Sequence, residues 1–281
     1  PYIHKKWKGS LEEILENDFQ CPYTHSLLSE WNERYSIAPL LVECPEGKKV
    51  VITEADLMNY PGMFLYNYKK GSGETLSGYF ARVPDKTEIG GHNMVQEKID
   101  SRKDYIAECQ PFEKFPWRVV AVSSSDKELT DSDIVWKLAT PAADTDWSWV
   151  RPGKVAWDWW NAWNIKGVDF EAGVNNDTYK YYIDFAAAHG IEYIIMDEGW
   201  AQRAKANLFL INPDINLEEL VSYANGKNVG IILWASYNSI VKNPEKAMSH
   251  YAKMGFKGFK IDFINRDDQQ AVKFCERMAR I

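Results

Sequence analysis

The stretch MGFKGFKIDFINRDDQ, residues Met254–Gln269, decides the fold of the second half of this chain. It predicts a strand between two helices, the first of which ends at Gly255. Strands in that setting are usually buried on both faces, yet this one carries charge. Apolar and charged positions alternate along it, with Phe259, Ile261 and Phe263 on one side and Lys260 and Asp262 on the other. The lysine and the carboxylate are therefore expected to pair in a shared space.

Three further strand and helix pairs precede this stretch. Their helices show apolar stripes at helical spacing, and Asn216 and the pair Asn243-Pro244 mark two helix starts. The predicted strands span residues 154–160, 193–200, 230–237 and 259–263, and the helices begin near residues 177, 216, 244 and 265–269. This alternation of strand and helix indicates parallel strands covered by helices.

Two architectures fit such a pattern, a doubly wound open sheet and a (β/α)8 barrel. No glycine-rich phosphate loop follows the first strand, which weakens the nucleotide-binding version of the open sheet. Acids and tryptophans at the strand ends favour the barrel, because barrel enzymes place their chemistry there. Only four repeats occur before Ile281. Half a barrel would leave strand edges uncovered, so we expect the natural chain to continue.

The first half of the chain has a different sequence pattern, in which short β-rich runs are separated by turn signals. Predicted strands are APLLVEC, KKVVITEA, GMFLYNY, LSGYFARV, WRVVAVSS and IVWKLA, between residues 38 and about 145. This spacing is typical of a β-sandwich. The sequence thus predicts the later part of a sandwich domain in residues 1–145, a linker to about residue 153, and four βα units in residues 154–281.

Bulk composition excludes several classes of protein. The net charge is −7 and no basic stripe is present, which argues against a nucleic-acid binder. No run of 18 apolar residues predicts a membrane span, and the chain opens without a charged and apolar leader. The four cysteines are scattered, so they permit a disulfide without requiring one. The 39 aromatic residues (12 Trp, 15 Tyr, 12 Phe) suit either a core or sugar binding.

Polar and aromatic side chains gather at the predicted strand ends. The first three strands contribute Trp157 to Trp160, then Asp197, Glu198 and Trp200, then Trp234, Tyr237 and Asn238, with no acid on the third strand. On the fourth, the ammonium of Lys260 should keep Asp262 ionised, as a nucleophile requires. A buried ion pair that only stabilises the barrel is the alternative.

The other strand-end residues leave alternatives open. Glu198 can contact substrate or hydrogen-bond a loop, and strand alternation lets only one of Asp197 and Glu198 point inward. The tryptophans can bind sugar or fill the barrel, and Asp267 is the candidate cap of the last helix. There is no GxSxG, HExxH or His/Cys cluster, which leaves carboxylate chemistry, and paired carboxylates on a barrel cut glycosidic bonds.

Four motifs resemble glycoside hydrolase family 97, whose members come mainly from gut Bacteroides and act on α-glycosides. They are ITEADLMNYPGMFL (52–65), KVAWDWWNAWN (154–164), MDEGW (196–200) and GFKGFKIDFINRDDQ (255–269). The resemblance implies an N-terminal β-sandwich, a catalytic (β/α)8 barrel and a C-terminal β-domain. This chain would hold the later sandwich and the first half of the barrel.

The resemblance also implies a mechanism. Inverting α-glucosidases of the family carry a base on the third strand, whereas retaining α-galactosidases carry a nucleophilic aspartate on the fourth. LWASYNS offers no third-strand acid and Asp262 is on the fourth strand, which indicates retention through a covalent glycosyl-enzyme. Its acid/base would be a glutamate beyond Ile281. Lys260 would bind a sugar hydroxyl, and the substrate pocket would be shaped by Glu198, Trp157, Trp200 and Trp234.

Further expectations come from the same resemblance. Glu54 is expected to be one ligand of a calcium ion, with the remaining ligands downstream; a solvated strand-end acid is the alternative. The substrate would be an α-linked oligosaccharide, and the location periplasmic or secreted. Two other functions compete with a retaining α-galactosidase: an α-glucosidase of the same family, and a non-catalytic carbohydrate-binding protein.

Overall fold

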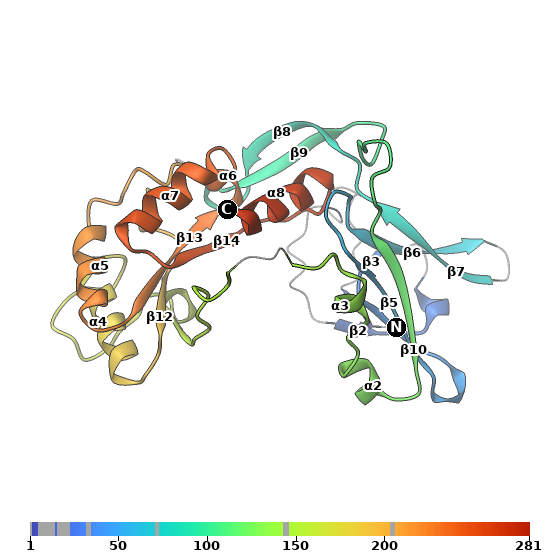
Figure 1. Cartoon of the computed structure of the whole chain (residues 1–281), viewed down its shortest axis with the longest axis horizontal. Helices are drawn as coiled ribbons and strands as arrows, with labels where there is room; N and C mark the ends of the chain where they lie inside the picture. The colour runs from blue at the N-terminus through green and yellow to red at the C-terminus, as the bar shows by residue number, and fades with distance from the viewer. Residues whose placement is uncertain are drawn as a thin grey trace. The chain divides into compact units, whose positions relative to one another are not determined.

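A computed structural model describes residues 2–4, 15, 23–31, 35–70, 73–142, 146–202 and 206–281 (Figure 1). The chain forms two compact units, and neither is continuous in sequence. The first contains residues 1–88, 99–144 and 265–280, and the second residues 89–98, 145–264 and 281. Two segments thus lie outside the unit that surrounds them in sequence, the short stretch at 89–98 and the last helix.

The first unit is built from antiparallel strands. Three of the four runs predicted before residue 85 and the run at 117–123 appear as long strands, and shorter ones accompany them. Two three-stranded sheets have the orders β10-β5-β4 and β3-β6-β7, and β1 pairs with β2. The strands are β1 (Tyr2–His4), β2 (Tyr23–His25), β3 (Tyr35–Ile37), β4 (Leu40–Glu43), β5 (Lys49–Ala55), β6 (Met63–Lys70), β7 (Gly73–Phe80) and β10 (Trp117–Ser123).

The two three-stranded sheets share an apolar core. Trp31 is fully buried there against Leu40 of β4 and Leu65 of β6. Val50 and Ile52 of β5 pack against the same cluster. Because β4 and β5 belong to one sheet and β6 to the other, the sheets face each other across this core, which is the packing of a sandwich.

The sequence failed to predict a hairpin in this part of the chain. Strands β8 (Pro84–Gly90) and β9 (Gln96–Arg102) pair in a two-stranded sheet, and the 3₁₀ turn η3 (His92–Met94) forms its tip. Exposed polar residues dominate β8, so the hydrophobic pattern that reveals buried strands is missing. The tip segment, residues 89–98, belongs to the second unit.

The strand predicted for IVWKLA is wrong. Residues Ile134–Leu138 form helix α3, which follows the short helix α2 (Asp126–Thr130). Asp133 pairs with Lys137 at 2.8 Å, an ion pair between residues four apart that a helix permits. The segment has no strand partner among the described residues, and its Trp136 is exposed, so β propensity did not decide its structure.

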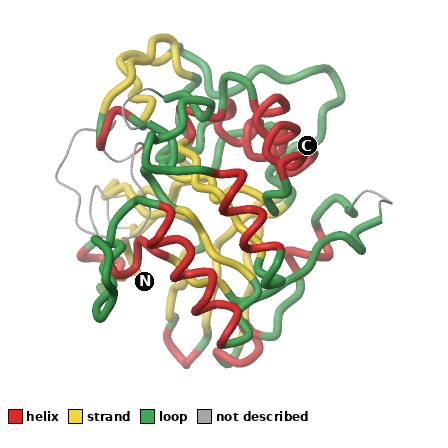
Figure 2. The backbone as a smooth tube through the Cα atoms, turned by 90° about the vertical axis from the view of Figure 1, so that its left-hand side faces the viewer, coloured by secondary structure: helices red, strands yellow, loops and turns green. Residues whose placement is uncertain are grey.

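The second unit contains a four-stranded parallel sheet with the order β11-β12-β13-β14, as its sequence pattern predicted. Helices α4, α5 and α7 lie along one side of this sheet (Figure 1), and in Figure 2 they lie in front of the strands. The elements are β11 (Val155–Trp157), η4 (Asp158–Asn161), α4 (Asn176–Ala188), β12 (Tyr193–Met196), α5 (Leu217–Asn225), β13 (Gly230–Ser236), α6 (Tyr237–Ile240), α7 (Pro244–Met254) and β14 (Gly258–Asp262).

Local signals set the ends of these helices. The Asn175 side chain accepts the N–H of Thr178 at the start of α4, and Asn216 does the same for Glu219 at the start of α5. Pro244 opens α7, where its missing N–H costs no hydrogen bond. Gly255 ends α7 with a φ of 107°, a left-handed conformation that glycine adopts without a steric cost.

The last helix, α8 (Gln269–Arg280), belongs to the first unit. The prediction that Asp267 caps this helix is wrong. Oδ1 of Asp268 accepts the N–H groups of Gln270 and Ala271 instead. The Gln269 amide donates to the carbonyl of Asn59 at 3.0 Å and thereby ties the helix start to its unit. Across the described ranges of the chain, no helix is long and apolar enough to cross a membrane.

Candidate active site

Three charged side chains meet at the carboxyl ends of β12 and β14. Nζ of Lys260 lies 2.8 Å from Oδ2 of Asp197 and 3.1 Å from Oδ2 of Asp262. Lys260 and Asp262 are two residues apart on β14, so they leave the same face of the strand, as the alternation predicted. Asp197 directly follows β12 and is buried. One ammonium is thus shared by carboxylates from two strands that β13 separates.

Asp262 is held by hydrogen bonds as well as by charge. Trp234 on β13 donates its Nε1–H to Oδ2 at 3.1 Å, and Phe263 donates its backbone N–H to Oδ1 at 2.8 Å. Burial raises the pKa of this carboxyl, but the two hydrogen bonds and the charge of Lys260 outweigh it and hold the pKa below the ordinary value of 3.8. The side chain is still 36% exposed. Asp262 is therefore an ionised and accessible carboxylate.

Lys260 is fixed on a third side by an aromatic ring. Its Nζ lies 4.3 Å from the centre of the Trp157 ring, within the range of a cation–π contact. The same indole donates its Nε1–H to Oδ2 of Asp197 at 2.6 Å. Trp157 comes from the end of β11 and Asp197 from the end of β12. Asp197 and Trp157 thus set the position of the ammonium beside Asp262.

Asp158 supports this arrangement through hydrogen bonds. It is 1% exposed, and its carboxylate accepts the backbone N–H of Asp197 and the indole N–H of Trp163, the latter at 2.8 Å. Burial raises the pKa of Asp158 to about 6, although the hydrogen bond from the Asp197 backbone acts in the opposite direction. Asp158 therefore fixes the backbone that carries Asp197.

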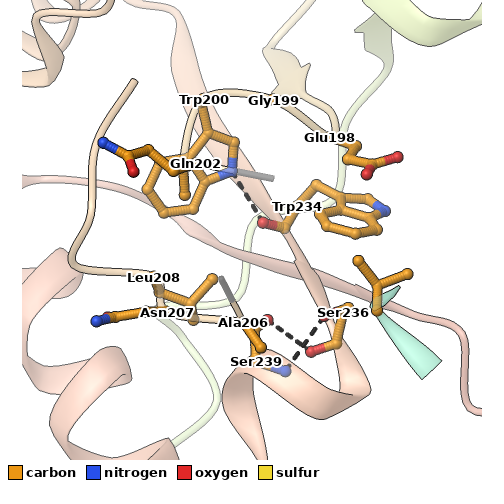
Figure 3. Close-up of a pocket in the computed structure, with 12 residues that line it drawn as sticks. Glu198, Gly199, Trp200, Gln202, Ala206, Asn207, Leu208, Trp234, Ser236 and Ser239 are labelled. Atoms are coloured by element: carbon orange, nitrogen blue, oxygen red, sulfur yellow. Dashed lines mark hydrogen bonds between the residues drawn. The ribbon is translucent and has the colours of Figure 1, made fainter. Parts of the chain in front are cut away.

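A pocket lies beside the charged cluster, between the loop after β12 and the start of α6 (Figure 3). It surrounds about 350 Å³ of empty space, including the part open to solvent. Glu198 and Trp234 lie on the same side of it, and Ser236 and Ser239 hydrogen-bond to each other across another side. Its other lining residues are Val95, Gly199, Trp200, Ala201, Gln202, Ala206, Asn207 and Leu208.

Glu198 faces the hairpin tip rather than Lys260. Nδ2 of Asn93 donates to Oε1 of Glu198 at 2.8 Å, and Nε2 of His92 lies 3.3 Å from Oε2. Asp197 and Glu198 therefore contact different neighbours, although both follow the end of β12 and strand alternation does not apply to them. Glu198 is 8% exposed, so the tip contacts a carboxylate with little access to water.

The three tryptophans that were predicted to shape the substrate pocket differ in their contacts. Trp234 lines the pocket and bonds Asp262, and Trp157 contacts Lys260. Trp200 is 1% exposed, its Nε1–H bonds the carbonyl of Trp234 at 2.9 Å, and its ring packs edge-on against Tyr251. Trp200 can therefore offer the pocket only a ring surface, because its polar atom is already used.

Glu54 lies at the end of β5 in the first unit. One carboxylate oxygen accepts the N–H of Met63 at 2.9 Å and the other is ion-paired with Arg118. Burial raises the pKa of Glu54 above its ordinary value, against the effect of these partners. Among the described residues no group of three or more histidine, cysteine, aspartate or glutamate side chains could hold a metal ion. With a guanidinium on one oxygen, these residues do not fit calcium by themselves.

Sequence reasoning missed several residues of this site. Asp197 was assigned no role, although its carboxylate bonds both Lys260 and Trp157. His92 and Asn93 carry no signal of their own, because they lie about 105 residues before their partner. The arrangement can present an ionised carboxylate beside a fixed ammonium and an open pocket, which suits nucleophilic attack on a sugar.

Two family models match this chain. Residues 4–141 match "Glycosyl-hydrolase 97 N-terminal" and residues 159–281 match "Glycoside hydrolase 97". A retaining alpha-galactosidase of Bacteroides thetaiotaomicron is 47% identical over 282 aligned residues, which cover 100% of this chain and 42% of that protein. A probable retaining alpha-galactosidase of Streptomyces bingchenggensis is 29% identical, over 58% of this chain and 25% of that protein.

Solved structures share the fold. A family 97 enzyme from Pseudoalteromonas sp. strain K8, solved in complex with acarbose, superposes with a TM-score of 0.73 at 20% identity, over 94% of this chain and 41% of that one. A beta-arabinopyranosidase gives a TM-score of 0.67 at 19% identity, over 99% of this chain and 42% of that one. The chain spans about two fifths of the length of these relatives.

Proposed function

Because the chain belongs to glycoside hydrolase family 97, we propose that the full-length protein is a retaining α-galactosidase with Asp262 as its nucleophile. The position of Asp262 is the observation that carries this proposal. It ends the fourth parallel strand, keeps a depressed pKa and remains partly exposed beside a pocket. Strand β13 (Gly230–Ser236) holds no acid that could serve as the base of an inverting enzyme.

Double displacement is the mechanism that this geometry supports. A carboxylate oxygen of Asp262 attacks C1 of the sugar, and the bond from C1 to the leaving oxygen breaks. The leaving oxygen takes a proton from an acid/base carboxyl expected beyond Ile281. The resulting base then removes a proton from water, which attacks C1, releases Asp262 and gives a product with the original anomeric configuration.

Lys260 has two roles in this proposal. Its charge lowers the pKa of Asp262, and one of its hydrogens can bond a sugar hydroxyl while Asp197 and Trp157 hold the amine in place. The substrate is a terminal α-linked galactoside of an oligosaccharide. Glu198, Trp234 and the ring surface of Trp200 line the pocket that would receive it.

We propose that the parallel sheet is the first half of a (β/α)8 barrel. Strands β11 to β14 follow one another in sequence order without a reversal, and helices α4, α5 and α7 cover one side (Figure 1). A doubly wound sheet would reverse its order and carry helices on both faces. The remaining strands would come from beyond residue 281.

From the family we also propose that the full-length protein binds calcium and that it is periplasmic or secreted. Glu54 would supply one oxygen to the ion, and the other ligands would have to come from outside the residues described. Chelation of the purified full-length protein with EDTA tests this, read by the loss of bound calcium in elemental analysis and by the change in Tm. For a periplasmic or secreted location, fractionation of the native host supplies the test.

Substitution of the nucleophile tests the proposed function. Asp262→Gly in the full-length protein should reduce hydrolysis of an aryl α-galactoside by at least about 10⁴-fold. Sodium azide should then form an azide of inverted configuration and restore part of the turnover. An active Asp262→Gly variant would remove Asp262 from the mechanism.

The sugar and the stereochemistry are tested separately on the wild type. NMR of the first anomer released from aryl α-galactoside and aryl α-glucoside identifies both. Initial α-galactose supports the proposal. Initial β-glucose would favour the inverting α-glucosidase instead, and binding of sugar without any hydrolysis would favour a carbohydrate-binding protein.

A further inference from the structure

The tip of the β8–β9 hairpin has an unusual backbone and specific neighbours. Gly91, Asn93 and Met94 have φ values of 71°, 47° and 58°, in the left-handed region that residues other than glycine seldom occupy. Val95, which follows them, is buried and lines the pocket. Such conformations persist where surrounding contacts fix them, and they concentrate at functional sites.

One neighbour of the tip is Glu198. The Asn93 amide donates to Oε1 at 2.8 Å, and the His92 ring lies 3.3 Å from Oε2. Glu198 has a side-chain exposure of 11%, whereas that of His92 is 57%. The tip therefore limits the rotation of a pocket carboxylate that follows strand β12, although the His92 ring is itself largely exposed.

The other neighbour is the residue after Asp262. The His92 ring stacks on Phe263, with centroids 5.6 Å apart and planes 18° apart. Phe263 itself has a left-handed φ of 59°, donates its N–H to Asp262 and meets Trp234 edge-on at 6.1 Å. His92 thus supports a strained residue whose backbone holds the predicted nucleophile.

We propose that the hairpin tip is a positioning element of the sugar site, in which Asn93 orients Glu198 and His92 supports Phe263. This rests on the proposed function, because it takes Glu198 as an acceptor for a hydroxyl of the bound galactoside. The Asn93 amide and the His92 ring face the two oxygens of this carboxylate and hold it in a defined direction, so the tip contributes to selection of the sugar. His92 and Asn93 act through their neighbours and do not touch the reacting atoms.

Asn93→Gly is the sharpest variant of the tip. Glycine adopts a φ of 47° readily, so the change removes the amide without adding backbone strain. In the full-length protein it should raise KM for an aryl α-galactoside about tenfold and leave kcat within about twofold, as expected for the loss of one hydrogen bond to a charged group. Asn93→Asp keeps the shape but places like charges together, and should raise KM further.

A double-mutant cycle shows whether Asn93 acts through Glu198. In a Glu198→Gln background, Asn93→Gly should change KM by less than about twofold. An equal rise in KM in both backgrounds would overturn the proposal, and so would an unchanged KM in Asn93→Gly. Lys86→Ala, an exposed position on β8 of the same hairpin, is the matched control and should leave KM unchanged.

Two variants test the contact between His92 and Phe263. His92→Ala should lower kcat about fivefold, the size of a lost aromatic pair, and His92→Phe should restore it by stacking again. Equal kcat values in these two variants would exclude a role for stacking. A wild type that hydrolyses α-galactosides while every tip variant behaves like Lys86→Ala overturns this inference alone, whereas an inactive wild type overturns the proposed function with it.

Discussion

Nζ of Lys260 on β14 lies 2.8 Å from Oδ2 of Asp197 at the end of β12. The same nitrogen lies 3.1 Å from Asp262, so the charge that favours ionisation of Asp262 is positioned by a second carboxylate. Asp197 is itself fixed by Trp157 and by the buried Asp158. A substitution at any of these residues should therefore change the position of the Lys260 charge and, through it, the ionisation of Asp262.

Removal of Lys260 should move the acid limb of activity. The Lys260 charge is one of the causes that lower the pKa of Asp262, so Lys260→Ala should raise that pKa. Hydrolysis requires the ionised carboxylate, so the acid limb of kcat/KM should shift to higher pH. The exposed Lys242→Ala serves as the control. An unchanged acid limb would show that Lys260 does not influence Asp262.

Asp197→Asn should lower activity without unfolding the protein. The amide keeps the shape but cannot balance the charge of Lys260, which then has only one carboxylate partner among the described residues. We expect kcat to fall by about 10- to 100-fold, since a misplaced positioning group costs that much. Steady-state kinetics and circular dichroism check both parts. Asp169→Asn, at an exposed position, should match the wild type.

Asp158 should make stability depend on pH in a defined direction. Its folded pKa of about 6 lies above its ordinary value of 3.8, so between these values the folded state keeps a proton that the unfolded state loses. Wild-type stability therefore falls as pH rises through this window. Asn does not titrate, so the Tm of Asp158→Asn minus the wild-type Tm should increase from pH 4 to pH 6 and stay constant above pH 7. A flat difference would contradict the raised pKa.

The packing of α5 against the parallel sheet should contribute strongly to stability. Leu220 is fully buried on α5, and its truncation leaves a cavity. Leu220→Ala should reduce the free energy of unfolding by about 2–5 kcal/mol. Leu210→Ala, at a position that is 40% exposed, should change it by less than about 1 kcal/mol. Denaturant unfolding of both variants checks the difference.

The parallel sheet could be predicted from sequence because its signals are local. Asn216, Pro244 and Gly255 mark helix ends through their own backbone chemistry, and the apolar stripes have the helical period. The first half offered less, because IVWKLA has strand-like composition but forms a mostly exposed helix. The β8–β9 hairpin, with mainly exposed residues on β8, lacked any pattern.

In the candidate site, too, the sequence predicted only the relationships that are local in the chain. Alternation along one strand predicted that Lys260 and Asp262 share a face, which the 3.1 Å contact confirms. The partnership of Asp197 with Lys260 spans 63 residues and an intervening strand, so no local pattern encodes it. Glu198 and Asn93 of the hairpin tip, which are hydrogen-bonded, are separated by 105 residues in the sequence.

The discontinuous second unit has a consequence for synthesis of the protein. Asn93 leaves the ribosome 105 residues before Glu198, which at roughly 5–20 residues per second is a delay of about 5–20 s. During that interval the tip lacks the carboxylate that it contacts in the folded protein. A nascent chain halted before residue 198 would carry a hairpin whose amides exchange with solvent, and protection at Met94 and Val95 would arise only once β12 has emerged.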